Sequence, residues 1–214
     1  MKIEGDIVNV NKKKLGFTLI EVVVVLAVVA ILAAILTPSI VKSINDSKIA
    51  RANNETQVIG AAMASFYKDL GRWPTKDGTT TTGNVLYVLY SAGNPMTGVT
   101  NWISTSGTWA AQKDTFDNHL ARNTPRGATV PANQYSVTGK FKWNGPYMTE
   151  VTADPWGTHY SCNVISLWLN NWTNYAVYVL SAGPDMSVTT PIQQLITTTT
   201  PPTLRGDDIG YRMK

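Results

Sequence analysis

The stretch KKKLGFTLIEVVVVLAVVAILAAIL, residues 12–36, decides how the rest of the chain is organised. Three lysines precede an apolar run of about 20 residues, which as a helix of about 30 Å can span the hydrocarbon core of a bilayer. The lysines favour the cytoplasmic side for that end of the run. Glu21 is the one charge inside the run, and a carboxylate there is a hypothesis about function, unless it simply reaches water at the membrane interface.

The order of these features differs from that of a secretory signal, which loses its apolar run through a small-residue site on the far side. Here the segment KLGFTLIE, residues 14–21, stands before the run. This segment resembles the processing signal of type IV pilins and type II secretion pseudopilins, whose leader a prepilin peptidase removes after the glycine. The resemblance implies cleavage between Gly16 and Phe17, methylation of the Phe17 amine, and retention of the apolar run.

Cleavage would give Glu21 a partner. The new amino group of Phe17 would be positive at a helix N-terminus, where it opposes the helix dipole in apolar surroundings. A carboxylate four residues on can neutralise it, from the same chain or from a neighbouring one. The resemblance implies that the pairing forms between subunits during filament assembly.

Composition excludes some function classes. The formal charge of the 214 residues is +4, and leader 1–16 contributes four lysines and two acids, so the mature chain carries 14 basic and 12 acidic residues, a net +2. This is weak evidence for nucleic acid, and we expect no nucleic-acid partner. No paired carboxylates, metal-binding histidine set or phosphate loop appear, so we expect no enzyme activity.

Cys162 is the single cysteine, so the chain cannot form an intramolecular disulfide. We expect its thiol to be packed as a small hydrophobic group. His159 and Asp154 lie nearby in the sequence, but this is proximity alone and does not predict a catalytic nucleophile and base.

Beyond the apolar run, hydrophobic residues recur at steps of three and four, as on one face of a helix. Pro38 predicts a kink or a locally melted turn, or only the end of the membrane segment. Gly71, with Pro74 beyond it, is a typical helix stop. We therefore predict one helix, membrane-spanning over 17–37 and amphipathic over 38–70. The recurring positions are Ile40, Val41, Ile44, Val58, Ile59, Ala62, Met63, Phe66 and Leu70.

Two regions follow the helix. Residues 71–146 are rich in Thr, Gly, Asn and Pro and predict a loop-rich variable region, with an insertion over 93–137, a short helix around 114–121, and an apolar element at 85–90 that we interpret as another helix. Within residues 147–214, β-branched and aromatic residues recur at every second position near 160–168 and 175–180, which predicts antiparallel strands. The predicted fold class is α+β, a long N-terminal helix packed on a small antiparallel sheet.

Tryptophan is abundant, with seven in the chain. An aromatic platform for sugars would use such residues, but core or inter-subunit packing is the more common role. We expect Trp102, Trp109 and Trp172 to be the exposed ones.

The motif Asp154-Pro155-Trp156-Gly157 closely matches a phrase that precedes the sheet in major pseudopilins of type II secretion. Physically, Asp154 can cap the turn, Trp156 can fill the core, and Gly157 permits a tight reversal. We assign this motif a structural role and no chemistry.

A second resemblance to major pseudopilins involves Asp185, Asp207 and Asp208. In major pseudopilins a similar Ser-x-Gly-Pro-Asp and a later Asp-Asp-Ile bound a calcium-binding loop, and calcium prefers six to eight hard oxygen ligands. Here Met186 replaces the usual glycine, and residues 186–205 form a longer loop than in the family, which adds little closure entropy. The resemblance implies calcium at these three carboxylates; the alternative is that they are solvated turn residues.

The resemblance as a whole implies a structural subunit, a major pseudopilin that polymerises into a helical filament of identical chains, the periplasmic pseudopilus of type II secretion. Its implied partners are the prepilin peptidase, minor pseudopilins and the inner-membrane assembly platform. The implied location is the bacterial inner membrane, crossed once, with the N-terminus cytoplasmic and the C-terminal domain periplasmic. Two alternatives stay open: a type IV pilin of a surface fibre for adhesion or motility, and a membrane-anchored polysaccharide-binding module.

Overall fold

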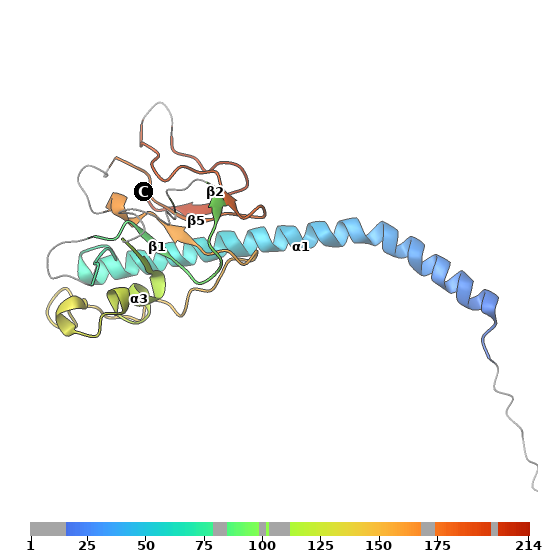
Figure 1. The fold of residues 1–214 in the computed structure, drawn as a ribbon, viewed down its shortest axis with the longest axis horizontal. Coiled ribbons are helices and arrows are strands. Elements are labelled where there is room, and N and C mark those ends of the chain that lie inside the picture. Colours follow the sequence, from blue (N-terminus) through green and yellow to red (C-terminus); the bar gives the residue numbers. More distant parts are fainter. Residues whose placement is uncertain (1–15, 79–84, 99–101, 103–111, 168–173, 198–200) are drawn as a thin grey trace, which may run out of the picture. The chain divides into compact units, whose positions relative to one another are not determined.

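The computed structural model describes residues 16–78, 85–98, 102, 112–167, 174–197 and 201–214. The chain divides into two compact units, Met1–Asn45 and Asp46–Lys214. Helix α1 covers Leu19–Leu70 and so begins in the first unit and ends in the second (Figure 1). Its apolar N-terminal part makes it the helix of the described chain that is long and apolar enough to cross a membrane.

The ends of α1 follow local rules. At the start, Thr18 and Glu21 exchange hydrogen bonds around the first turn. At the end, Gly71 takes a left-handed φ of 65°, and its N–H donates to the carbonyl of Tyr67 at 2.8 Å. The predicted helix over 17–70 is therefore confirmed to within two residues. Helical structure runs unbroken through Pro38, so the turn there is not melted, and the kink stays a prediction.

The second unit contains a five-stranded sheet in the order β3-β1-β4-β5-β7. The pairs β1–β4, β4–β5 and β5–β7 are antiparallel, whereas β1–β3 is parallel. The sheet is therefore mixed, whereas the sequence predicted an antiparallel one. A second, two-stranded parallel sheet pairs β2 with β6. The strands are β1 Val88–Tyr90, β2 Thr97–Gly98, β3 Lys113–Thr115, β4 Ser161–Cys162, β5 Tyr178–Ser181, β6 Ser187–Val188 and β7 Ile209–Arg212.

Short helical segments complete the described part of this unit. They are α3 Phe116–Leu120, η1 Pro125–Gly127, η2 Pro131–Asn133 and η3 Val164–Leu167. The helix predicted around 114–121 is confirmed as α3, which Thr115 caps by accepting the N–H of Asn118. The helix interpreted at 85–90 is wrong, because that apolar run pairs with β3 and β4 as strand β1. A short apolar run fits either structure, and the neighbouring strands decide.

One core lies between α1 and the sheet. Met63 and Phe66, both with no exposed surface, come from the helix face that the three-and-four spacing predicted. Leu89, Cys162 and Val179 come from the facing side of the sheet. Each large side chain buried here stabilises the fold by about 1.5–3 kcal/mol. The sequence pattern thus located this core correctly on the helix side.

A second core covers the opposite face of the sheet, and the sequence did not predict it. It contains Val88, Tyr178 and Leu180 from the five-stranded sheet, Val188 from β6 and Trp102 from the segment after β2, and no residue of α1. Trp102 is 1% exposed, and its indole N–H donates to the carbonyl of Thr190 at 2.6 Å. The expectation that Trp102 is exposed is therefore wrong. Trp109 and Trp172 lie outside the described residues.

The turn at 154–157 forms as its residues predict, with one exception. Asp154 accepts the N–H groups of Trp156 at 3.0 Å and Thr158 at 2.8 Å, and the hydroxyl of Ser181 in β5 at 2.6 Å. Gly157 takes the positive φ of 90° that the reversal requires. Trp156 is only half-buried and belongs to neither core, so the expectation that it fills the core is wrong.

Gly60 allows α1 to approach β7 closely. A Cβ at this position would lie 2.6 Å from Cδ1 and 2.8 Å from Cε1 of the Tyr211 ring. Glycine in a helix interior costs about 1 kcal/mol relative to alanine, so Gly60 lowers the helix propensity of α1 at the point where the helix contacts Tyr211.

We predict that Gly60→Ala destabilises the second unit by about 1 kcal/mol or more, because the clash with Tyr211 outweighs the gain in helix propensity. Denaturant unfolding followed by tryptophan fluorescence measures the change. In the Tyr211→Ala background the same substitution is expected to be neutral or stabilising. Equal effects of Gly60→Ala in the two backgrounds would contradict this explanation.

Candidate functional site

The predicted processing residues, Gly16 and Phe17, precede the first turn of α1. Gly16 has open space around it, and Phe17 is 89% exposed. Glu21 accepts both the N–H and the hydroxyl of Thr18 at 2.8 Å, and its own N–H donates back to that hydroxyl at 3.3 Å. This reciprocal arrangement is a capping box. The Thr-x-x-Glu spacing is the sequence signal of a capping box, and the box holds the Glu21 carboxylate at the start of the helix.

The C-terminal corner brings together the two loops that carry the three aspartates. Asp185 donates its backbone N–H to Asp207 Oδ2 at 3.0 Å. Gly183, with φ 71°, lets the backbone of Asp207 approach so closely that a Cβ on the glycine would lie 2.2 Å from the Asp207 carbonyl oxygen. Met186 has a φ of 58°, the left-handed conformation that a glycine adopts freely.

Asp208 is buried at this corner with one oxygen satisfied and one not. Its Oδ2 accepts the N–H groups of Thr189 at 3.0 Å and Thr190 at 2.6 Å. Its Oδ1 is buried and has no hydrogen-bond partner in the described chain. Asp185 Oδ1 accepts the N–H of Ser187 at 2.7 Å. A cation beside Asp208 Oδ1 would satisfy it, and carboxylate oxygens are the donors that calcium prefers.

The three carboxylates are not gathered into a ready metal site. Among the described residues, no group of three or more His, Cys, Asp or Glu side chains is placed to hold one ion. Backbone carbonyls and water would have to supply part of any coordination shell. Calcium at Asp185, Asp207 and Asp208 therefore stays a proposal.

The sequence neighbours Cys162, His159 and Asp154 have separate roles. Cys162 lies in the core beneath α1, and burial raises the pKa of its thiol. The ring of His159 lies 5.7 Å from that of Tyr90 between centroids, and its Nε2 is buried without a partner in the described chain. Burial and the charge of Lys113 lower the pKa of His159 to about 4. A protonated thiol and an unpaired imidazole do not form a nucleophile–base pair.

A buried polar network that the sequence did not reveal organises the insertion. His119 Nε2 lies 2.9 Å from Asp114 Oδ2, and its Nδ1 lies 2.7 Å from the hydroxyl of Tyr135. Burial raises the pKa of Asp114, but its bonds and charge interaction with His119 and the N–H of Arg126 outweigh this and lower it. Arg126 in turn pairs with Asp77 at 2.7 Å. Every member is bonded, so the network fixes residues 114–135 against the turn after α1.

Comparison with known proteins agrees with this architecture. Residues 11–37 match the family model described as the prokaryotic N-terminal methylation motif. The type II secretion system core protein G of Pseudomonas aeruginosa is 28% identical over 135 residues, which cover 63% of this chain and 90% of that protein. The fimbrial protein EcpC of Eikenella corrodens is 29% identical over 131 residues, 60% of this chain and 79% of that protein.

A further relative matches over a shorter part of the chain. The type IV major pilin protein PilA of Myxococcus xanthus is 36% identical over 63 residues, 29% of each chain. No solved structure matches the chain significantly. The methylation motif, the long helix packed on a small sheet and these relatives together make the chain similar to the type IV pilin-like family.

The buried His159 predicts a loss of stability in mild acid. The folded state lowers its pKa from 6.5 to about 4, so the unfolded chain binds the proton more readily. Its contribution to folding is therefore complete above pH 6.5 and is lost as the pH falls from 6.5 towards 4, by about 3 kcal/mol in all.

We expect His159→Gln to flatten the pH dependence of unfolding free energy in this window, whatever its effect at neutral pH. Denaturant unfolding of both proteins at pH 4.5, 5.5, 6.5 and 7.5 measures the difference, and carboxylates shared by both cancel. Parallel curves for the two proteins would contradict the prediction.

Proposed function

We propose that this chain is a major pseudopilin, a structural subunit that polymerises into the periplasmic filament of a type II secretion system. The observation that carries the proposal is the processing motif at the head of α1, followed by a helix that packs its second half on a sheet. The core protein G match supports the secretion form, because it extends over 90% of that relative and not only over the motif. The relatives are structural subunits, which supports a function without catalysis.

Assembly follows from the chemistry of the N-terminus. Prepilin peptidase cuts between Gly16 and Phe17, and methylation follows on the new amine of Phe17. The Glu21 carboxylate, already held at the helix start by Thr18, then neutralises the amine of a neighbouring subunit. The apolar side chains of α1 between Leu19 and Leu36 are exposed in the single chain, and in the filament they pack against other copies of the helix.

The remaining partners and the location belong to the same proposal. The subunit inserts once in the inner membrane, with its N-terminus cytoplasmic and its C-terminal domain periplasmic, as the lysines of 12–14 favour. Minor pseudopilins and the inner-membrane assembly platform then act on it as partners.

Calcium at the C-terminal corner is the second part of the proposal. The ion would lie beside Asp208 Oδ1, the buried oxygen without a partner, with Asp185 and Asp207 as further ligands. It would hold the loop 186–205 to the end of the sheet, a task that a disulfide cannot perform in a chain with one cysteine.

A surface fibre for adhesion or motility is the second candidate. It is favoured by the similarity to the fimbrial protein EcpC and to the pilin PilA. Deleting the gene separates the two: loss of exoprotein secretion supports the pseudopilin, and loss of surface fibres supports the pilin. The third candidate, a polysaccharide-binding module, loses one of its proposed contacts, because Trp102 is buried.

We predict that Glu21→Ala inserts in the membrane and is cleaved normally but assembles few filaments, because the Phe17 amine then lacks its neutralising charge. Cleavage is read from the mass of the mature chain, and assembly from sheared filaments after overexpression in the host. Thr18→Ala is the matched control for the capping box alone. Normal filaments from Glu21→Ala would contradict the assigned role.

For calcium, we expect the melting temperature of the full chain in detergent to rise in calcium chloride and fall in EGTA. Asp208→Asn should abolish that difference, because it removes the charge nearest the proposed ion. Asp46→Asn, which removes an exposed charge on α1, should retain it. An unchanged melting temperature in the unsubstituted protein would remove the metal from the proposal and leave the filament function intact.

A further inference from the structure

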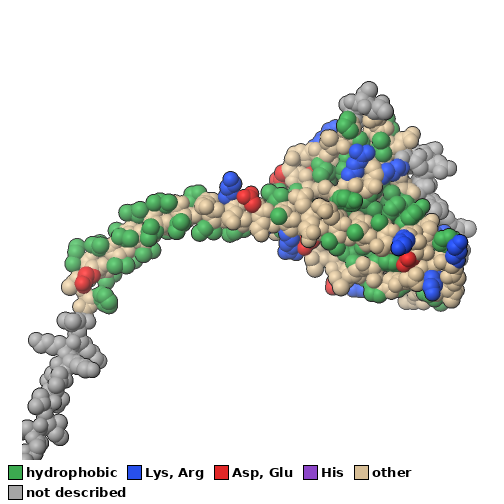
Figure 2. Space-filling model, turned by 180° about the vertical axis from the view of Figure 1, so that it is seen from behind, with side chains coloured by type: hydrophobic (Ala, Val, Ile, Leu, Met, Phe, Trp, Pro, Cys, Tyr) green, Lys and Arg blue, Asp and Glu red, His purple; other side chains and the backbone are tan. Residues whose placement is uncertain are grey.

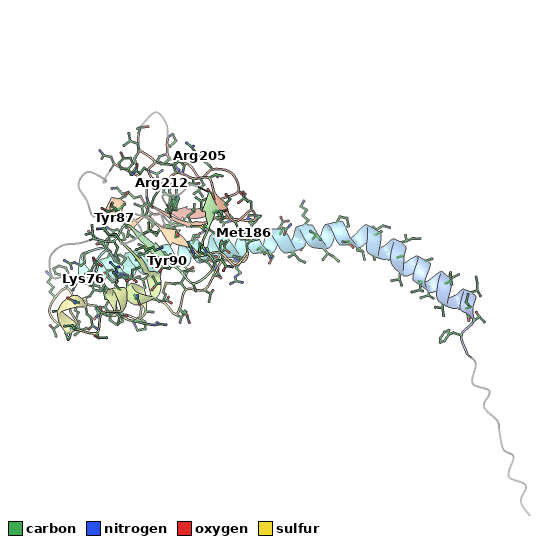
Figure 3. The ribbon with its side chains drawn as sticks, in the orientation of Figure 1. Lys76, Tyr87, Tyr90, Met186, Arg205 and Arg212 are labelled. Atoms are coloured by element: carbon green, nitrogen blue, oxygen red, sulfur yellow. The ribbon has the colours of Figure 1, made fainter. Side chains whose placement is uncertain are left out.

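An open pocket of about 390 Å³ lies where α1 ends and the insertion folds back over it. Leu70 and Tyr135 contribute to its lining, and Arg72, Lys76, Ser136 and Phe141 supply its polar and aromatic groups. Figure 3 shows Lys76 near this end of the helix. The pocket lining combines residues that are more than 60 positions apart in the sequence, such as Leu70 and Phe141. A local sequence pattern could therefore not predict it.

Two cations share this pocket. The ammonium of Lys76 donates hydrogen bonds to the carbonyls of Ala132 at 3.1 Å and Gln134 at 2.5 Å. These bonds fix the position of the ammonium in the pocket lining. Arg72 is exposed and forms no ion pair in the described chain. Burial and the charge of Arg72 lower the pKa of Lys76, as expected where two positive groups lie close together.

The acidic residues next to the pocket are engaged with other partners. Asp77 pairs with Arg126 at 2.7 Å. Burial and the carboxylate of Asp69 raise the pKa of the Tyr147 hydroxyl, so Asp69 lies close to that group. Neither neutralises Arg72 or Lys76, so a negative group arriving from outside meets two cations with no carboxylate partner in the described chain.

Phe141 adds an apolar contact at the rim. Its side chain is 58% exposed, and it lies against Gly71, where a Cβ would be 3.4 Å from the ring. The ammonium of Lys140 stands 5.5 Å from the ring centroid. Figure 2 shows further lysine and arginine side chains at several points on the face of this unit in view. An exposed ring beside unpaired cations offers an anion both charge and apolar surface.

We propose that this pocket binds an acidic segment of a partner polypeptide. A carboxylate lies between Arg72 and Lys76, where the guanidinium can bind it with two hydrogen bonds, and a neighbouring apolar side chain packs on Phe141. A nucleic acid would favour cations spread along a backbone, and a sugar chain would favour several aromatic faces, whereas this pocket has one focus of charge and one exposed ring. The assignment goes beyond the filament function, which gives this pocket no role.

The test uses the full chain in a nonionic detergent and a fluorescein-labelled peptide of alternating glutamate and leucine. Fluorescence anisotropy should show saturable binding that weakens with salt. Arg72→Gln should weaken it about fivefold, the effect of losing about 1 kcal/mol. Arg122→Gln removes the same charge from an exposed residue outside the pocket lining and should leave binding unchanged.

Two further arms decide the nature of the ligand. Phe141→Ser should weaken binding of the glutamate–leucine peptide more than that of an all-glutamate peptide of equal charge. Absent saturable binding, or an equal loss in Arg72→Gln and Arg122→Gln, would overturn the proposal. Tighter binding of oligogalacturonate than of the peptide, lost in Arg72→Gln, would overturn the polypeptide assignment in favour of an acidic sugar. Matching melting curves for Arg72→Gln and the unsubstituted chain show that folding is intact.

Discussion

The packing of one face of α1 on the sheet is the contact on which the rest of the second unit depends. Met63 and Phe66 have no exposed surface, and the strands that meet them come from positions far along the chain. Glu55 in the same helix accepts a hydrogen bond from the buried Tyr160 at 2.5 Å and pairs with Arg51 at 2.8 Å, so polar contacts add to the apolar ones. Because the same helix continues into a run with exposed apolar side chains, one element serves both a folded domain and an assembly surface.

The N-terminal motif and the C-terminal corner differ in how fully their carboxylates are hydrogen-bonded. At the N-terminus, the Thr18–Glu21 capping box uses side chains to complete the first turn of α1. At the C-terminal corner, Asp208 accepts two backbone N–H groups with one oxygen and leaves the other unpaired. In the insertion, the His119 network leaves no such gap. The unpaired oxygen therefore marks the corner as the place where an additional ligand has something to offer.

Sequence reasoning located the features that depend on local patterns. The span of α1, its stop at Gly71, and the turn at Asp154 follow from periodicity and from residues with fixed conformational preferences, whereas the Thr18–Glu21 capping box was not predicted. It failed where partners distant in the sequence decide. Residues 88–90 form a strand because β3 and β4 flank them, Trp102 is buried because the loop after β5 lies over it, and Arg72 and Lys76 meet Phe141 through the fold alone. The roles of Gly16 and Phe17 rest on family resemblance, since geometry gives only their exposure.

The second core has a consequence for how these loops can vary. The strand Thr97–Gly98 pairs with Ser187–Val188, and Trp102 from the first loop is held by the carbonyl of Thr190 in the second. Neither loop buries its apolar residues without the other. A change in length of one would leave an unfilled space or an exposed tryptophan unless the other changed with it. The two segments therefore form a single packing unit, and transplanting either one alone into another protein would transfer half of a hydrophobic interface.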